Sequence, residues 1–193
     1  MATTSYHHGD LKNALIKAGV EILASEGLGG LSLRKVAKQA GVSHTAPYSH
    51  FTDKQALIAA ITTEGFKQLY QQIESVREAY KADPEILLVE TAWAYVKFAL
   101  NSPDRFKLMF SGVLEKEKEY PEFVEISQAS FSQLVKIVEI CQRAKILKPG
   151  ASDLVAVSVW STVHGFTSLL LEDQISHTVL ERASLKDLLI LII

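Results

Sequence analysis

Apolar residues recur at helical spacing along almost the whole chain. In the first amphipathic run these residues are Leu11, Leu15, Ala18 and Ile22. Gly27 is expected to end that run, because glycine readily leaves helical geometry. A second stripe consists of Leu33, Val36, Ala37 and Ala40. Ser32 is placed to cap the start of this second helix, and Gly41 is placed to cap its end.

Proline and capping residues divide the rest of the chain into further helices. Thr52–Gln55 has the pattern of a capping box, and it starts a helix that the apolar residues extend to about residue 80. Later helix starts are expected at Asp83–Pro84, Ser102–Pro103 and Pro121. Pro149 stops the last of these, Ser152 caps Leu154–Leu171, and a final amphipathic stretch begins at about Thr178. No strand-like alternation stands out, so the sequence predicts an all-α fold with about nine helices.

The stretch GVSHTAPYSHF, residues 41–51, is too short and polar for a core helix, yet it joins two amphipathic patterns. Gly41 can take the left-handed conformation, Ser43 is expected to cap a new helix, and Pro47 is tolerated only near a helix start. A short helix is therefore expected from about residue 43 to Phe51. The order of helix, tight glycine turn and short second helix predicts a helix-turn-helix motif at about residues 32–51.

Helical geometry assigns the side chains of this short helix to faces. Pro47 and Phe51 share one face and are expected to pack inward. The outward positions are Thr45, Ala46 and Ser49, and the flanks carry His44, Tyr48 and His50. Small outward side chains with longer hydrogen-bonding neighbours suit the major groove of DNA. The alternative is an ordinary corner between two helices with a polar outer face.

Lys54 lies in the first turn of the next helix, where the helix dipole disfavours a cation. A phosphate at that helix start would be bound by free backbone N–H groups and by Lys54 together. The alternative for this residue is an ordinary solvated lysine.

Composition narrows the class of protein. The 193 residues are 48% hydrophobic, as a packed core requires, and the single cysteine, Cys141, indicates a reducing compartment. The N-terminal MATTSYHHGD has no apolar core of the kind that a signal peptide requires. Runs such as Leu188–Ile193 are far shorter than a membrane-spanning helix. A cytoplasmic protein without membrane contact is therefore expected.

Charge is divided unevenly along the chain. Residues 1–54 carry six basic and four acidic side chains, a net charge of +2, whereas the remainder carries fourteen basic and eighteen acidic ones, a net charge of −4. The net charge of −2 for the whole chain argues by itself against nucleic-acid binding. The small basic N-terminal part beside an acidic remainder favours nucleic-acid binding, but only weakly.

The segment LSLRKVAKQAGVSHTAPYSHFTDKQALIAAI resembles the DNA-binding segment of the TetR family of bacterial transcriptional repressors. The shared features, which follow without a gap, are Ala37, Gly41-Val42-Ser43, Tyr48, His50-Phe51, Lys54 and Leu57. Downstream, FALNSPDRFKLMFSG and the spaced Trp160 and His164-Gly165 are similar to a TetR subgroup whose C-terminal domain is named for Trp, His and Gly. YHHGDLKNAL is similar to the start of that subgroup, so His7 and His8 are interpreted as native residues.

The resemblance implies a homodimeric transcriptional regulator, with a DNA-binding helix-turn-helix domain at residues 1–54 and an effector-binding and dimerisation domain at residues 55–193. The implied partners are double-stranded DNA with a pseudo-palindromic operator, and a small, largely apolar effector that releases a repressor from that operator. By motif position the DNA contacts are Arg34, Ser43, His44, Thr45, Ala46, Tyr48, Ser49, His50 and Lys54. The phosphate contacts among them are Tyr48, His50 and Lys54. The base-edge contacts are Thr45 and Ala46, with Arg34 as the candidate for guanine.

Aromatic residues at internal spacing favour an apolar pocket between helices of the body, which is a normal ligand site. The candidate effector contacts are Phe66, Trp93, Phe106, Met109, Phe110, Trp160 and His164. The alternative for each is a plain core position. His164 either points into a cavity or bonds to a nearby backbone carbonyl.

An enzyme is one alternative, and a helical small-molecule-binding or protein-interaction module without DNA binding is another. The sequence has no glycine-rich phosphate loop, metal-ligand cluster or nucleophile motif, so no catalytic residue, metal or cofactor is expected. His164 is separated by 11 residues from Asp153 and by 8 from Glu172, so neither carboxylate falls within one helical turn of it.

The segments Leu154–Leu171 and Leu185–Ile193 are expected to form the dimer interface. The first is apolar on nearly every side, and such a helix must be buried from all sides. The second carries more apolar surface than the end of a monomer should expose. Leu170 and Leu189 are expected at the seam of this isologous four-helix interface. The alternative is a tail that packs only on its own chain.

Overall fold

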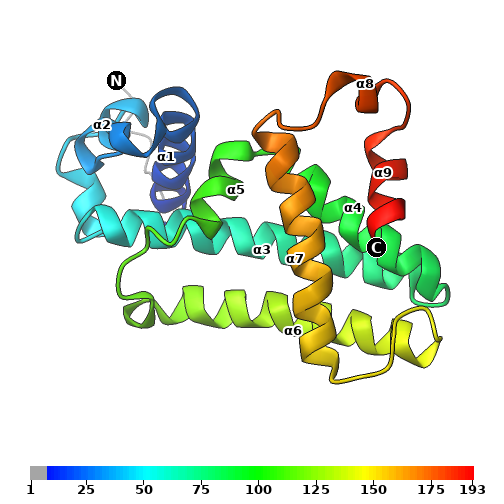
Figure 1. Cartoon of the computed structure of the whole chain (residues 1–193). Helices are drawn as coiled ribbons and strands as arrows, with labels where there is room; N and C mark the ends of the chain where they lie inside the picture. The colour runs from blue at the N-terminus through cyan, green and yellow to red at the C-terminus, as the bar shows by residue number, and fades with distance from the viewer. Residues whose placement is uncertain (1–7) are drawn as a thin grey trace. The chain divides into compact units, whose positions relative to one another are not determined.

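The computed structural model describes residues 8–193 (Figure 1). His7, interpreted above as native together with His8, lies outside the described residues. From residue 8 to residue 193 the chain forms nine α-helices, two short 3-10 helices and no strand, which confirms the all-α prediction. In chain order these are α1 (His8–Gly30), α2 (Leu33–Gln39), η1 (Ala46–Ser49), α3 (Lys54–Tyr80), α4 (Pro84–Asn101), α5 (Pro103–Phe110), η2 (Glu117–Glu119), α6 (Pro121–Arg143), α7 (Ser152–Leu171), α8 (His177–Leu180) and α9 (Leu185–Ile192).

The described chain divides into two compact units. The first comprises residues 8–65 and Asp104–Glu125, and the second comprises Phe66–Pro103 and Ile126–Ile193. The boundary between the units falls inside α3 and not at residue 54, where the functional division was placed. The physical reason is that α3 continues without interruption past residue 54 and supplies its first three turns to the core of the first unit.

In the first unit, α1 packs against α2, and α2 packs against η1. The predicted break at Gly27 is present, because its φ of 67° and ψ of −173° interrupt the helical backbone of α1. The buried apolar side chains of this unit include Leu15, Ile22, Leu31, Leu33, Val36, Phe51, Leu57, Ile58 and Ile61. This core holds α2 and the 41–51 segment in a fixed position on α1.

The segment Asp104–Glu125 belongs to the first unit, and two residues of α3, Gln55 and Gly65, contact it. The Gln55 side chain donates from Nε2 to the Val113 carbonyl at 3.3 Å and accepts at Oε1 from the Glu115 N–H at 3.1 Å. A Cβ placed on Gly65 would lie 2.5 Å from Met109 Sδ, so the Met109 side chain of α5 packs directly against the backbone of α3 at this glycine.

Two of the predicted helix caps are wrong. Asp53, and not Thr52, caps α3, because its Oδ1 accepts from the Ala56 N–H at 2.8 Å. Ser152 lies inside α7, where its hydroxyl donates to Gln142 Oε1 at 2.8 Å, and Ala151 precedes the helix without a side-chain cap. Gln55, the second member of the predicted box, and Ser152 instead bind residues outside their own helices.

In the second unit, α4 packs against α7 and α9, and α7 packs against α9 (Figure 1). The stretch from Thr178 onward is two helices, α8 and α9, where a single one was predicted. The break arises at Ser184, whose Oγ accepts from the Asp187 N–H at 3.2 Å while Asp187 Oδ2 accepts from the Ser184 N–H at 3.1 Å. This capping box was present in the sequence as Ser-x-x-Asp and was missed.

One face of α7 is buried and the opposite face is exposed. The buried residues are Ala156, Val163, Phe166 and Thr167, and the large apolar residues on the exposed side are Leu154, Val157, Trp160 and Leu169. By length and composition alone, with a mean hydropathy of 1.6, α7 could cross a membrane, and it is the one such helix found in the described part of the chain. Only short runs such as Leu188–Ile193 were compared above with the length of a membrane span, and α7 is the longer apolar helix.

Candidate DNA-binding surface and effector region

The turn after α2 closes in the way that the sequence predicts. Gly41 has a φ of 69°, in the left-handed region where a side chain is strained. The Gly41 N–H donates to the Lys38 carbonyl at 3.2 Å, and the Val42 N–H donates to the Ala37 carbonyl at 3.0 Å. This pair of bonds is the Schellman motif, and it reverses the chain so that residues 43–51 return alongside α2.

The second helix of the motif begins later than predicted and is a 3-10 helix, Ala46–Ser49, instead of an α-helix. Ser43 does not cap it with its side chain. The Ser43 hydroxyl pairs with the Thr45 hydroxyl at 3.1 Å, and its carbonyl accepts from the Ala46 N–H at 3.0 Å. Pro47 in the first turn has no N–H to contribute to a longer α-helical ladder, which favours this tighter, shorter form.

The assignment of faces in this segment is confirmed for the inward residues. Pro47 is buried and Phe51 is 2% exposed, so both pack into the first unit. The exposed side chains are His44, Thr45, Tyr48 and Ser49, and the half-buried ones are Ala46 and His50. Tyr48 has the most prominent side chain, with 60% of its surface exposed.

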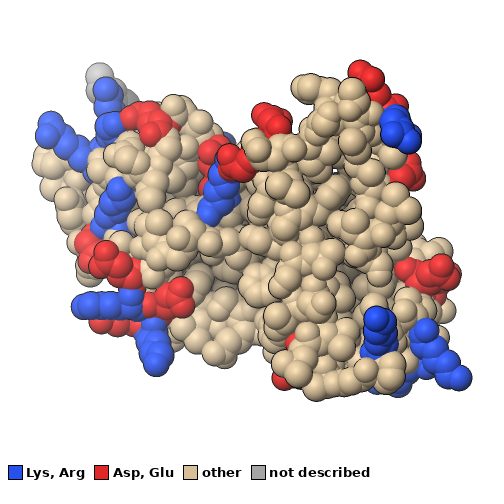
Figure 2. Space-filling view, viewed as in Figure 1, with Lys and Arg blue, Asp and Glu red and all other residues tan. Residues whose placement is uncertain are grey.

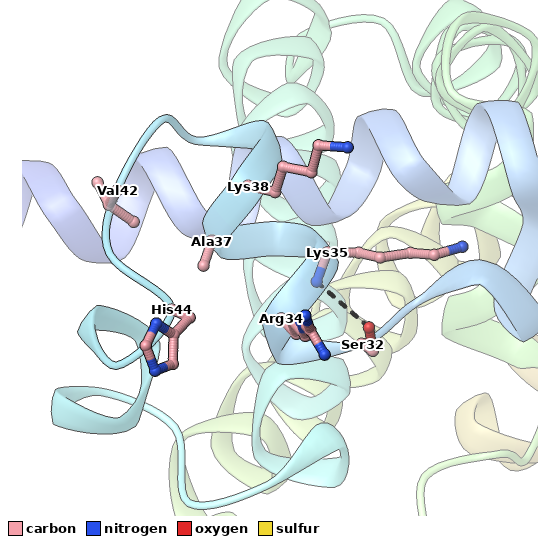
Figure 3. A pocket seen from close by; sticks show the side chains of 7 residues that line it. All are labelled: Ser32, Arg34, Lys35, Ala37, Lys38, Val42 and His44. Atoms are coloured by element: carbon pink, nitrogen blue, oxygen red, sulfur yellow. Dashed lines mark hydrogen bonds between the residues drawn. The ribbon is translucent and has the colours of Figure 1, made fainter.

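An open hollow of about 590 Å³ lies between α2 and the 41–45 turn (Figure 3). It is lined by Ser32, Arg34, Lys35, Ala37, Lys38, Val42 and His44. Figure 3 shows His44 on one side and Arg34 with Ser32 on the other, while Lys35 and Lys38 extend away from His44. The three basic side chains are exposed, so this hollow combines small apolar walls with positive charge.

The basic residues of this surface differ in their partners. Lys35 forms an ion pair with Glu26 of α1. Lys54, at the start of α3, donates from Nζ to the Leu28 carbonyl at 2.9 Å. This bond gives the cation at the helix start a hydrogen-bond acceptor within the chain. The side chains of Arg34 and Lys38 make no hydrogen bond or ion pair with the described residues, and both are exposed to solvent.

The seven candidate effector residues are divided between the two units. Phe106, Met109 and Phe110 belong to α5 in the first unit, where the rings of Phe106 and Phe110 lie 4.9 Å apart. The other four belong to the second unit. Phe66 is buried there, and Trp93 is half-buried with the Lys97 ammonium 5.9 Å from its ring centroid.

Trp160 and His164, one turn apart on α7, hold a third residue that the sequence analysis did not identify. The indole N–H of Trp160 donates to Tyr95 Oη at 3.2 Å, and Tyr95 Oη lies 2.7 Å from His164 Nδ1. Because an indole nitrogen can only donate, the Tyr95 hydroxyl accepts from Trp160. The direction of its bond with His164 Nδ1 depends on the tautomer of the imidazole ring. The Phe131 ring of α6 completes the cluster, 6.4 Å from the Trp160 ring.

Burial acts on both titratable groups of this cluster. It raises the pKa of the Tyr95 hydroxyl and lowers the pKa of the His164 ring, in each case disfavouring the charged form. The sequence did offer a signal for Tyr95, because a tyrosine among the apolar residues of α4 has a hydroxyl that needs a partner when it is buried.

Acidification is expected to destabilise the protein through His164. The folded-state pKa is lowered from the ordinary value of 6.5, so the unfolded chain binds the additional proton first and stability falls as the pH drops through about 6.5. Thermal unfolding of the natural chain and of His164→Gln at pH 7.5 and 5.5 measures this contribution. The Tm of the natural chain should fall further between pH 7.5 and pH 5.5 than the Tm of the variant. Equal decreases would contradict the proposed contribution of His164.

Two observations bear on metal and thiol chemistry in the described part of the chain. No group of three or more His, Cys, Asp and Glu side chains there is arranged to hold a metal ion. Cys141 is buried, its Sγ lies 3.4 Å from the Pro84 carbonyl, and burial raises the pKa of its thiol to about 11. A thiol that stays protonated at neutral pH is a poor nucleophile.

Two family models match the chain. The one described as "Bacterial regulatory proteins, tetR family" matches residues 15–61, which include α2 and η1. The one described as "Tetracyclin repressor-like, C-terminal domain" matches residues 88–191, which include the cluster of Tyr95, Trp160 and His164. The resemblance to the Trp-His-Gly subgroup is not addressed by these matches and stays a prediction.

Relatives and solved structures agree with the two models. YobS of Bacillus subtilis (strain 168), an uncharacterized HTH-type transcriptional regulator, is 26% identical over 171 residues, which is 86% of this chain and 81% of YobS. A protein of unknown function from Rhodococcus sp. RHA1 superposes with a TM-score of 0.81 at 33% identity, over 97% of this chain and 93% of its own. FadR from Bacillus subtilis, solved in complex with stearoyl-CoA, has a TM-score of 0.70 at 21% identity, over 94% and 98% of the two chains.

The chain therefore belongs to the TetR family of bacterial regulatory proteins, and it is a DNA-binding transcriptional regulator. The helix-turn-helix at residues 32–51 and the helical body after it match the two parts that the family models describe. YobS carries the name of a transcriptional regulator, which favours this class over an enzyme.

Proposed function

We propose that the protein is a homodimeric repressor that binds a pseudo-palindromic operator and leaves it when a small, largely apolar effector binds the body. The observation that supports this proposal most directly is the exposed surface formed by α2 and the 41–49 segment. It carries the unpaired cations Arg34 and Lys38 beside small polar side chains. Such a surface suits the major groove of DNA, where cations can bind the phosphates and small polar side chains can contact the base edges.

Most of the proposed DNA contacts divide into base-edge contacts and phosphate contacts. Thr45 and Ala46 lie at the start of η1 and are proposed to face base edges, with Arg34 as the candidate for guanine. The proposed phosphate contacts are Tyr48, His50 and Lys54, and the remaining contacts are Ser43, His44 and Ser49. The hydroxyl pair of Ser43 and Thr45 holds Thr45 in a defined orientation before DNA arrives.

The proposed dimer interface is the exposed face of α7 together with α9. Figure 2 shows the surface over α7 and α9 almost bare of Lys, Arg, Asp and Glu. On α9 the exposed apolar residues are Ile190, Leu191 and Ile192. Leu189, which was expected at the seam, is fully buried within its own chain, and Leu170 is half-buried. Leu169 and Leu191 take their place in the proposed interface.

The functional division at residues 1–54 and 55–193 is retained as a proposal, with the reading surface in the first part and effector binding and dimerisation in the second. The effector is proposed to be largely apolar because the buried residues of the second unit are mostly aliphatic and aromatic. A protein that reads DNA in this way is proposed to work in the cytoplasm.

Selection from a random pool of duplex DNA tests the proposal. The purified natural chain should enrich duplexes with two inverted half-sites, and Arg34→Ala should enrich them poorly or with a relaxed sequence. Lys148→Ala, a change of one exposed cation in the second unit, is the matched control and should select the same sequence as the natural chain. Failure of the natural chain to enrich any sequence would contradict the proposed function.

Substitutions should separate phosphate contacts from base contacts. Lys54→Ala is expected to weaken binding to every duplex by about the same factor, whereas Thr45→Ala should relax preference at particular base pairs by roughly 1–3 kcal/mol. Because Lys54 also bonds to Leu28, the Tm of Lys54→Ala should fall slightly as well. Affinities for a panel of singly substituted operators measure both effects, and a changed preferred sequence in Lys54→Ala would overturn its role.

A further inference from the structure

Thr91 of α4 is a buried hydroxyl without a hydrogen-bond partner in the described chain. The residue is 5% exposed, and its Oγ1 makes no hydrogen bond with the described residues. Other buried threonines here do not share this state. Thr167 of α7 donates to the Val163 carbonyl at 2.7 Å, and Thr62 of α3 lies 2.9 Å from the Ile58 carbonyl. A buried polar group left unpaired is costly, so its retention calls for an explanation.

Thr91 lies one helical turn before Tyr95, on the same face of α4. Tyr95 is the residue that Trp160 and His164 hold from α7. The unpaired hydroxyl and the Trp160–Tyr95–His164 chain are therefore neighbours along one face of α4. The residues around them on α4 are apolar and buried, including Leu87, Leu88, Ala92 and Ala99.

The charges on the packed helices constrain what could bind there. In α7 the only Asp, Glu, Lys or Arg is Asp153, next to the helix start. On α4, Glu90 forms an ion pair with Lys186 of α9, Lys97 lies over the Trp93 ring, and Glu85 is exposed. The remaining charge of α9, Asp187, caps its own helix. A buried anion or cation would find no counter-charge among these side chains, and an unpaired buried charge is strongly disfavoured.

We propose that Thr91 and the Tyr95–His164 pair form the polar end of the effector site, and that this site takes an uncharged molecule with one hydrogen-bond acceptor, such as a carbonyl or hydroxyl oxygen, on an apolar body. The proposal rests on the proposed function in that it names the chemistry of the effector. Thr91 donates to the acceptor oxygen, and Tyr95, held between Trp160 and His164, fixes the wall of the site beside it.

The first test uses the stability of the ligand-free protein. Thr91→Val keeps the shape of the side chain and removes the unpaired hydroxyl, so its Tm should rise by about 2–4 °C at equal protein concentration. Thr167→Val removes a hydroxyl that is already bonded, so its Tm should stay level or fall. A lower or unchanged Tm for Thr91→Val would show that the hydroxyl is satisfied in solution and would overturn the proposal.

The second test uses binding of defined probes to the full-length protein, followed by thermal shift and tryptophan fluorescence. We expect 2-octanone and 1-octanol to bind the natural chain, octanoate to bind at least tenfold more weakly, and Thr91→Val to lose about tenfold in affinity for the neutral probes. Thr167→Val should bind them as the natural chain does. Absence of binding by both neutral probes, stronger binding of octanoate, or unchanged affinity in Thr91→Val would each overturn the proposal.

These tests are independent of DNA. If the natural chain selected no operator while Thr91→Val showed the raised Tm and the weakened probe binding, the proposed function would fail and the ligand site would stand. If the operator were selected but the probes failed, the regulator would stand and the proposed effector chemistry would fall.

Discussion

Changing Leu169 and Leu191 together to glutamate is expected to convert the dimer into monomers. These side chains are 50% and 78% exposed on α7 and α9, so within the monomer their charges stay in water and the fold survives. Across the proposed interface the same charges would be buried without partners. Sedimentation at micromolar concentration should show one chain per particle, and affinity for the full operator should fall at least about 100-fold, because each monomer reaches one half-site.

Two further variants sharpen this prediction. Gly165→Leu should split the dimer in the same way, since a Cβ at Gly165 meets no atom of its own chain within 4 Å and would obstruct only a partner helix. Ile146→Glu places the same charge on an exposed apolar residue of the second unit outside α7 and α9, and it should remain dimeric. A Leu169→Glu, Leu191→Glu protein that stays dimeric and binds the full operator normally would place the interface elsewhere.

Affinity for the operator is expected to fall about 10³-fold as the salt concentration rises from about 50 to about 200 mM. Each head offers Arg34, Lys38 and Lys54 as cations that are not held in a carboxylate pair, so a dimer neutralises about six phosphates. Replacing Lys54 with alanine should lower the slope of log affinity against log salt by about 2 per dimer, whereas Lys148→Ala should leave it unchanged. A slope near zero in the natural chain would mean that the α2 surface does not face the DNA backbone.

Most of the helices could be predicted because helix formation leaves local signals. Apolar residues at helical spacing, prolines at helix starts and Gly41 at a helix end are read within one or two turns of chain, and all of them hold in the structure. The inward side of the 41–51 segment was predictable for the same reason, since Pro47 and Phe51 are its apolar residues. The resemblance to TetR regulators rested on the same ungapped segment, and the family match confirms it.

Features that depend on partners far along the chain could not be predicted in this way. Whether Thr52 or Asp53 caps α3 depends on Gln55 being occupied by residues 113 and 115. The shift of the proposed seam from Leu189 to Leu191 depends on which side of α9 packs against α4 and α7. The apolar run Leu188–Ile193 does not by itself distinguish a side buried in its own chain from a side left for a second chain.

The sequence by itself determined the all-α fold and the helix-turn-helix motif, because helix periodicity, capping and turn spacing are short-range properties, and its resemblance to TetR regulators indicated the class of protein. Only the tertiary structure decided which polar groups meet. It joined Tyr95 of α4 to Trp160 and His164 of α7, 65 and 69 residues further along the chain, and it left the Thr91 hydroxyl unpaired one turn away. Hydrogen bonding requires donor and acceptor to lie within about 3 Å, and for residues so distant in the chain that separation is set by helix packing and leaves no mark on local sequence.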